Sequence, residues 1–238
     1  MTDKTVGVIG GLGPEATLDF FAKVLKATPA RRDQHHLHLI INNNPKVPDR
    51  NRALRGDGES PAAALADMAR ALQRAGAQVL CMPCNTAHAY AAAIRAATPL
   101  PFISIIDATL ETVRTLEPAV SHVGLLTADG GRRARVYEDA LQAAGLTAVR
   151  LDDDTQNALM QLIYGVKAGR TGAAERAAMA AFAKRLINDG AQVIVAGCTE
   201  VPLLLGPADV AVPLIDSTDA LARAVVRFAR SAEPVAAE

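Results

Sequence analysis

The stretch Met82-Pro83-Cys84-Asn85-Thr86-Ala87-His88 ends an apolar run, and a partial copy, Ala196-Gly197-Cys198-Thr199-Glu200, ends a second one. A short apolar run bounded by turn residues predicts a buried strand, and the Asn or Thr that follows predicts a helix start. Each cysteine should therefore lie at a strand-to-helix turn, where free backbone N–H groups and the helix dipole favour negative charge. There the pKa of a thiol should fall below its free value of about 8.5. We predict that the two thiols face each other across one substrate.

Predicted strands and helices alternate along the chain. The β-then-α order favours a parallel sheet with helices on both faces, which defines the α/β class. A polar loop rich in Asn, Pro, Gly and Arg interrupts the pattern over residues 42–60. In the first half we expect strands at 5–9, 36–41 and 78–82, a short strand within 99–106, and helices at 14–27, 61–75, 85–97 and 108–116.

The second half of the chain repeats the landmarks of the first in the same order. In each half a cysteine lies eight residues after the glycine of a Gly-Ala-Gln-Val sequence. We therefore predict two pseudo-symmetric α/β lobes, one formed by residues 1–107 with 213–238 and the other by 108–212. Because ligands of open α/β sheets bind beyond the carboxyl ends of the strands, both cysteines should reach one cleft between the lobes. The paired landmarks are Thr5–Ile9 with His122–Leu126, Gly10-Gly11 with Gly130-Gly131, Gly76–Val79 with Gly190–Val193, and Ile106-Asp107 with Ile215-Asp216.

Composition limits the classes of partner. The 238 residues carry 25 Lys and Arg against 25 Asp and Glu, and only 3% are aromatic, so neither nucleic acid nor an anionic membrane is expected as a partner. No apolar run has the length of a membrane span, and the N-terminus has no signal-peptide pattern. We expect a cytoplasmic protein whose three cysteines are thiols. The tail 231–238 is expected to fray.

Two thiols on opposite sides of a small molecule suit the inversion of a carbon that bears an acidic hydrogen. One group removes the proton from one face while the other delivers a proton to the opposite face, and a thiol that titrates near neutral pH can serve in either role. Backbone N–H groups at two helix starts would stabilise the charge of the intermediate.

Four motifs together carry a resemblance to a known family: Gly10-Gly-Leu-Gly-Pro-Glu-Ala-Thr17, Asn43-Asn-Pro-Lys-Val-Pro-Asp-Arg50, Pro83-Cys-Asn-Thr-Ala-His88 and Gly197-Cys-Thr-Glu200. They resemble the aspartate racemases of the cofactor-independent aspartate/glutamate racemase superfamily. The resemblance implies interconversion of L- and D-aspartate or a related acidic amino acid, Cys84 and Cys198 as the catalytic proton donor and acceptor, a homodimer, and neither pyridoxal phosphate nor metal. Thr-Glu after the second cysteine resembles the aspartate branch.

The same resemblance suggests which residues hold the substrate. Arg50 and Lys167 match positions that hold the side-chain carboxylate, and a guanidinium can bind a carboxylate through two hydrogen bonds. Leu12 stands where relatives usually have Met, and the loop 126–131 carries fewer threonines than is usual. The other expected substrate-binding residues are Leu12, Asn85, Thr86, Thr127, Thr199 and Glu200.

Other interpretations of these motifs stay open. Cys81 and Cys84 form a C-x-x-C that could be a redox pair, although Cys81 should pack inside the strand. Cys81, His88 and Cys198 could hold zinc, but a fourth ligand is not evident. Gly11-x-Gly13-x-x-Ala16 fits a loose dinucleotide fingerprint without the acid that should end the second strand.

Three functional classes follow: a racemase, a thiol oxidoreductase and a two-lobed binding protein without chemistry. Within the superfamily, glutamate racemase, hydantoin racemase, maleate isomerase and broad-specificity amino-acid racemase are alternatives to aspartate racemase.

Overall fold

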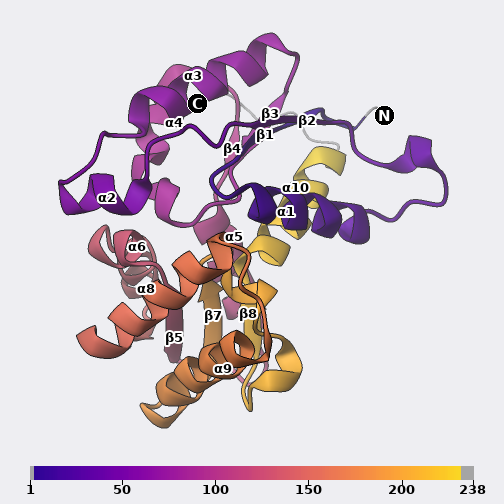
Figure 1. The fold of residues 1–238 in the computed structure, drawn as a ribbon. Coiled ribbons are helices and arrows are strands. Elements are labelled where there is room, and N and C mark those ends of the chain that lie inside the picture. Colours follow the sequence, from indigo (N-terminus) through magenta and orange to yellow (C-terminus); the bar gives the residue numbers. More distant parts are fainter. Residues whose placement is uncertain (1–2, 232–238) are drawn as a thin grey trace.

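The computed structural model describes residues 3–231, so the expected fraying of the tail lies, apart from Ser231, outside the described residues. Two four-stranded parallel sheets, flanked by helices, form two lobes (Figure 1). The strand order is β2-β1-β3-β4 in one sheet and β6-β5-β7-β8 in the other, so the second sheet repeats the topology of the first. The predicted two-lobed α/β fold is confirmed. The strands are β1 (Val6–Gly10), β2 (Leu39–Asn43), β3 (Val79–Cys81), β4 (Phe102–Ile103), β5 (His122–Thr127), β6 (Thr147–Val149), β7 (Val193–Gly197) and β8 (Leu214–Asp216).

Ten α-helices and four short 3₁₀ segments are assigned within residues 3–231. None of these helices has the length and apolar composition needed to cross a bilayer. The α-helices are α1 (Pro14–Ala27), α2 (Arg50–Arg55), α3 (Ala62–Arg74), α4 (Ala91–Ala97), α5 (Ile105–Arg114), α6 (Asp129–Arg133), α7 (Glu138–Ala143), α8 (Asp153–Lys167), α9 (Ala173–Asn188) and α10 (Ser217–Arg230). The 3₁₀ segments are η1 (Asp33–His35), η2 (Thr86–Tyr90), η3 (Val201–Leu203) and η4 (Pro207–Asp209).

The glycine turn after β1 brings the chain into α1. Gly11 has a φ of +87°, and a Cβ there would collide with the backbone of Asn44. The Gly11 N–H donates to Thr17 Oγ1 at 2.9 Å, which ties the turn to the first part of α1. Pro14 opens the helix, a position where its missing N–H is harmless. Gly11 is therefore required by its conformation and by this close approach.

Three predicted elements differ from the structure for local reasons. The loop 42–60 contains helix α2, because the Asp49 side chain caps the Arg52 N–H and Gly56 ends the helix in the left-handed conformation. The helix expected over 85–97 begins as the 3₁₀ segment η2 and becomes α-helical only at Ala91. Helix α5 begins earlier than predicted because Ser104 caps the Asp107 N–H.

The predicted boundary that placed residues 213–238 in the first lobe is wrong for strand β8. Strand β8 pairs with β7, so residues 214–216 belong to the second sheet rather than to the first lobe. Helix α10 then runs back to the first lobe and packs against α1 and α5 (Figure 1). The other residue bounds of the two lobes remain a prediction.

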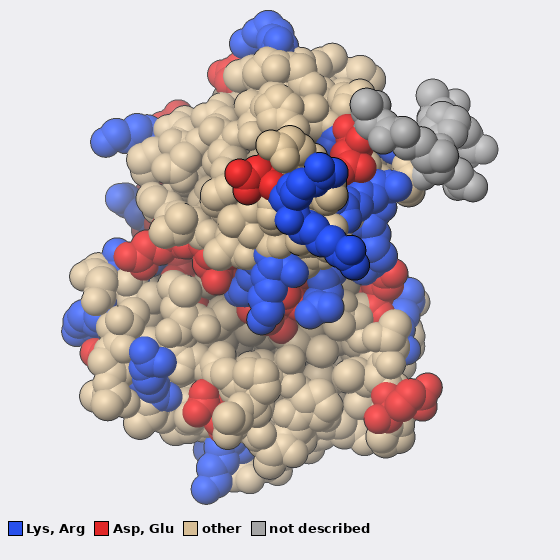
Figure 2. Space-filling view, turned by 90° about the vertical axis from the view of Figure 1, so that its right-hand side faces the viewer, with Lys and Arg blue, Asp and Glu red and all other residues tan. Residues whose placement is uncertain are grey.

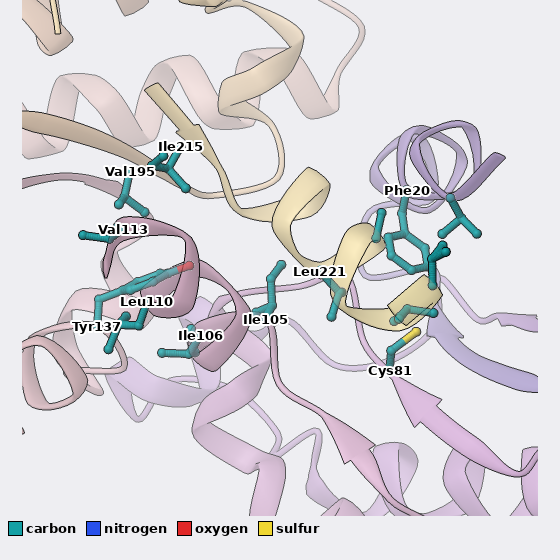
Figure 3. Close-up of a cluster of buried hydrophobic side chains, with 14 of the residues drawn as sticks. Phe20, Cys81, Ile105, Ile106, Leu110, Val113, Tyr137, Val195, Ile215 and Leu221 are labelled. Atoms are coloured by element: carbon teal, nitrogen blue, oxygen red, sulfur yellow. The ribbon is translucent and has the colours of Figure 1, made fainter. Parts of the chain in front are cut away.

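The lobes share a hydrophobic core. One buried cluster contains Val8 and Phe20 from the first lobe and Val123 and Val195 from the second, with side chains of α5 and α10 between them (Figure 3). Because this core crosses from one sheet to the other, burial favours a fixed arrangement of the two lobes.

An ion pair also joins the lobes. Lys23 on α1 pairs with Asp19 at 2.5 Å and with Asp216, at the end of β8, at 2.6 Å. Figure 2 shows basic and acidic side chains side by side along the line where the two lobes meet. The Lys23–Asp216 pair connects a first-lobe helix to the last strand of the second sheet.

Candidate active site

Cys84 lies in the turn that follows β3. Its backbone N–H donates to Met82 O at 2.8 Å, and η2 begins two residues later. The residue is 6% exposed. Cys198 follows β7 directly, is 7% exposed, and its carbonyl accepts from Val201 N at the start of η3. Both cysteines therefore lie at carboxyl ends of parallel strands, as predicted.

The two cysteines line the same small cavity between the lobes, with a volume of about 60 Å³. The structure thus brings together residues that lie more than a hundred positions apart in the sequence. Nine predicted site residues line this cavity: Leu12, Arg50, Cys84, Asn85, Thr86, Lys167, Cys198, Thr199 and Glu200.

Thr127 is the one predicted site residue that does not line the cavity. It ends β5 and is buried, and its carbonyl accepts from Gln156 Nε2 at 3.0 Å. Its methyl group lies against Gly197, where an added Cβ would clash with it. Ala128, the next residue, lines the cavity instead.

Glu200 links the second thiol to a lysine. Its Oε2 accepts from Cys198 Sγ at 3.0 Å and from Thr199 Oγ1 at 3.3 Å, while Oε1 pairs with Lys167 Nζ. Both carboxylate oxygens are therefore engaged within the protein, and the predicted substrate contact of Glu200 is in competition with these bonds.

The electrostatics at Cys198 differ from the sequence expectation. Burial, reinforced by the negative charge of Glu200, raises the pKa of the Cys198 thiol well above its ordinary value. The helix-dipole argument does not hold there, because η3 is a three-residue 3₁₀ segment with few aligned peptide dipoles. Burial is the largest influence on Lys167 and opposes its charge, but Glu200 and the two cysteines together outweigh it, so the pKa of Lys167 is raised. The thiol must therefore pass its proton to an acceptor before it can act as a base.

Arg50 is held at the cavity wall by backbone carbonyls. Its Nη2 donates to Leu12 O at 2.7 Å, and its Nη1 donates to Pro48 O at 3.2 Å and to Val47 O at 3.4 Å. These bonds orient the guanidinium, and its remaining N–H donors are available to a carboxylate.

A second hollow adjoins the cavity. It has a volume of about 390 Å³ and is lined by the glycine turn, Pro45 and Leu203. Arg50, Lys167 and Glu200 line both spaces, so these three side chains form the wall between them.

Four cavity residues were not predicted from the sequence: Asp49, Asn51, Ala128 and Ile163. Asn51 is buried, and its Oδ1 accepts from the Gly130 N–H at 2.9 Å, which joins α2 of the first lobe to α6 of the second. A Cβ on Gly130 would clash with Thr86 and Asn51. The repeated glycine pair was the available signal, because it marks where the second lobe approaches the first.

His88 supports the Cys84 turn without lining the cavity. The Ile105 N–H donates to His88 Nε2 at 3.1 Å, so Nδ1 carries the proton and donates to Cys84 O at 2.8 Å. Burial lowers the pKa of His88 to about 4, which keeps the ring neutral. His88 therefore ties the Cys84 turn to the start of α5.

Cys81 lies in β3 and is fully buried in the core near Phe20, as expected (Figure 3). Burial raises the pKa of its thiol. All three cysteines are free thiols. Over residues 3–231, no group of three or more His, Cys, Asp or Glu side chains is placed to hold a metal ion.

The fold and the site define a two-lobed α/β protein with two thiols in one interlobe cavity. Residues 9–225 match the Asp/Glu/Hydantoin racemase family, and the chain belongs to that family. The broad specificity amino-acid racemase RacX of Bacillus subtilis (strain 168) is 26% identical over 225 residues, which cover 93% of this chain and 96% of that relative.

Solved structures agree with this assignment. The aspartate racemase of Picrophilus torridus has a TM-score of 0.81 at 29% identity, covering 95% of this chain and 94% of that one. An aspartate racemase homologue from Pyrococcus horikoshii OT3 has a TM-score of 0.75 at 27% identity, covering 96% and 100%.

Proposed function

We propose that this racemase interconverts the L and D forms of an acidic amino acid, with aspartate as the first candidate, through the thiols of Cys84 and Cys198 and without pyridoxal phosphate. The observation that carries the proposal is the single cavity lined by both cysteines together with Arg50 and Lys167. A dicarboxylic amino acid has one carboxylate more than its ammonium neutralises, and two cations at the wall suit that charge.

In the proposed reaction, protons pass between Cys198, Glu200, the substrate and Cys84. Cys198 gives its thiol proton to Glu200 Oε2, to which it already donates. The thiolate removes the α-proton from one face of the substrate, and the thiol of Cys84 protonates the opposite face. Cys198 is then a thiol again, Glu200 is protonated and Cys84 is a thiolate. Exchange of one proton through water restores the starting state, and the reverse reaction uses the same steps in reverse order.

The substrate's two ends would contact different parts of the wall. Arg50 and Lys167 would bind the side-chain carboxylate, while Thr86 and Thr199 would bind the α-carboxylate and the amine. The adjoining hollow, which shares Arg50, Lys167 and Glu200 with the cavity, is the route by which we propose that the substrate arrives. A cytoplasmic homodimer remains our prediction for the working form.

A broad-specificity amino-acid racemase is the second candidate. Lys167 is already neutralised by Glu200, and Leu12, Ala128 and Ile163 give the cavity an apolar portion that could accept an uncharged side chain. The Bacillus subtilis relative carries this description.

One experiment separates these candidates. The purified chain is incubated without cofactor in deuterated water with L-aspartate, L-glutamate or L-alanine, and loss of the α-proton signal is followed together with the enantiomer ratio. Aspartate racemase activity predicts deuterium uptake with inversion that is fastest for aspartate. Similar rates on all three would favour the broad-specificity enzyme, and no exchange on any of them would contradict a two-thiol racemase of these amino acids.

A further inference from the structure

A chain of hydrogen bonds between buried side chains connects the two cysteine turns. The Tyr137 hydroxyl donates to Asn85 Oδ1 at 2.6 Å, Asn85 Nδ2 donates to Ser217 Oγ at 3.1 Å, and Ser217 Oγ donates to Ala196 O at 2.7 Å. Tyr137, Asn85 and Ser217 are each at most 2% exposed. Asn85 follows Cys84 directly, and Ala196 lies two residues before Cys198.

The donors and acceptors in this chain are fixed. The single hydroxyl proton of Ser217 goes to the carbonyl of β7, so its oxygen must accept from the amide of Asn85. That orientation leaves Asn85 Oδ1 facing Tyr137. Burial raises the pKa of Tyr137, so its hydroxyl stays protonated and donates. Thr109 gives its own proton to the carbonyl of Ile105, so its oxygen is a second acceptor for the Tyr137 hydroxyl, at 3.2 Å against 2.6 Å to Asn85 Oδ1.

Tyr137 reaches the site from the opposite lobe. It directly precedes α7 of the second lobe, and its ring belongs to the shared core with Ile106 and Leu110 of α5 (Figure 3). Its hydroxyl contacts a residue of the first lobe. The position of the Asn85 amide therefore depends on where the second lobe lies relative to the first.

We propose that Tyr137 is a positioning residue that sets where the Cys84 thiol lies relative to the substrate, through the amide of Asn85. This inference rests on the proposed two-thiol reaction. Removal of the hydroxyl would leave Asn85 Oδ1 buried without a donor, and the turn would shift to relieve it. Strand β7 stays held by its pairing with β5 and β8, so the effect falls on Cys84 rather than on Cys198.

The test uses Tyr137→Phe and the two α-deuterated enantiomers of aspartate. Because the two enantiomers are equal in energy, kcat/KM must be the same in both directions, and only isotope effects reveal which proton transfer has slowed. We expect kcat to fall roughly tenfold, less than the ~100-fold of a full 1 Å misplacement. The isotope effect should rise for the enantiomer that Cys84 deprotonates and fall for the other.

Glu200→Gln serves as the reference, because it weakens the Cys198 side. In Glu200→Gln the isotope effect should rise for the enantiomer that Cys198 deprotonates and fall for the one that Cys84 deprotonates, which is the reverse of Tyr137→Phe. Thr28→Val is the matched control: it removes a buried hydroxyl that donates to Val24 O at 2.6 Å outside the cavity lining, and it should leave both isotope effects unchanged.

The ratio of the two isotope effects decides whether Tyr137 has the positioning role. A Tyr137→Phe enzyme whose two isotope effects keep the wild-type ratio would overturn the positioning role. If Tyr137→Phe does not fold, Ser217→Ala releases the Asn85 amide from its other end, and the same divergence or its absence decides the matter. A wild-type chain that racemises none of the tested amino acids would count against the proposed function itself, which is a separate result.

Discussion

The two cysteine turns share a backbone plan but differ in the side chains that touch them. Each turn follows the third strand of its lobe, and the Gly that precedes each strand has nearly the same φ, +97° at Gly76 and +98° at Gly190. Around Cys84 the polar contacts are neutral and come from Asn85 and His88. Around Cys198 they are charged.

The difference shows that the repeated fold sets the positions of the two thiols but not their chemical surroundings. The repeated sheets place two thiols at corresponding points of one cavity. We propose that the residues that follow each cysteine then decide how its proton leaves. At Cys198 a carboxylate is in contact with the thiol. At Cys84 the polar contacts are neutral hydrogen bonds of Asn85 and His88, which in our proposal position the turn. We therefore expect the two proton transfers to have unequal barriers.

The largest effects should come from the thiols themselves. Cys84→Ser and Cys198→Ser should each lower racemisation of aspartate roughly 10³-fold or more, because a serine hydroxyl is a far weaker acid than a thiol and does not ionise near neutral pH to give the base. Chiral chromatography of the products measures this. Cys81→Ser is the control and should keep most of the activity, since Cys81 lies in the core. Loss of activity in Cys81→Ser alone would favour the redox alternative.

Glu200→Gln tests whether the carboxylate is a proton acceptor. We expect kcat to fall on the order of 100-fold, which is within the range of general base catalysis. The Glu200 charge raises the pKa of Cys198, so its removal should lower that pKa and speed alkylation of Cys198 by iodoacetamide. In Glu200→Gln the kcat of racemisation should therefore fall while the rate of Cys198 alkylation rises. Racemisation that rises together with alkylation would show that Glu200 only opposes the thiolate.

Arg50→Ala tests the contact with the side-chain carboxylate. Loss of a charged hydrogen bond of about 1.5–3 kcal/mol should raise KM for aspartate roughly 10- to 100-fold and leave alanine, if it is a substrate, nearly unchanged. Arg52→Ala is the matched control, because Arg52 lies on the same helix and is exposed. Equal losses on both substrates would remove Arg50 from any role in specificity.

The smallest expected effect concerns stability in acid. The pKa of His88 is lowered to about 4, so the unfolded state binds more protons than the folded state between about pH 6.5 and pH 4. The free energy of unfolding should therefore decrease by up to about 3 kcal/mol as the pH is lowered from about 6.5 to 4, with the loss complete below pH 4. Urea unfolding of the wild type and His88→Gln at several pH values measures it. The variant should lack this portion of the pH dependence, and parallel curves would contradict the assignment.

Much of the fold was readable from the sequence because its signals are local. Apolar runs followed by glycine or cap residues gave most strands and helices, and the repeated landmarks gave the two lobes. Helix α2 was missed because Arg and Asn dominate it, and its caps at Asp49 and Gly56 were read as loop residues. Strand β8 was assigned to the wrong lobe because pairing between distant strands leaves no local signal.

The site was predicted less completely, for a related reason. Motif residues such as Cys84, Cys198 and Lys167 are adjacent to recognisable sequence. Asn51 and Tyr137 matter through partners more than fifty positions away, and only the folded chain brings them together. The pKa of Cys198 could not be anticipated either, since burial and the contact with Glu200 depend on the turn's three-dimensional shape.

The most direct test of the central claim is a crystal structure of the chain with a bound dicarboxylate that resembles aspartate. The account predicts that the Sγ atoms of Cys84 and Cys198 lie on opposite faces of the same carbon, with one carboxylate against Arg50 and Lys167. A ligand that contacts only one of the two sulfur atoms, or that has both on the same face, would contradict it.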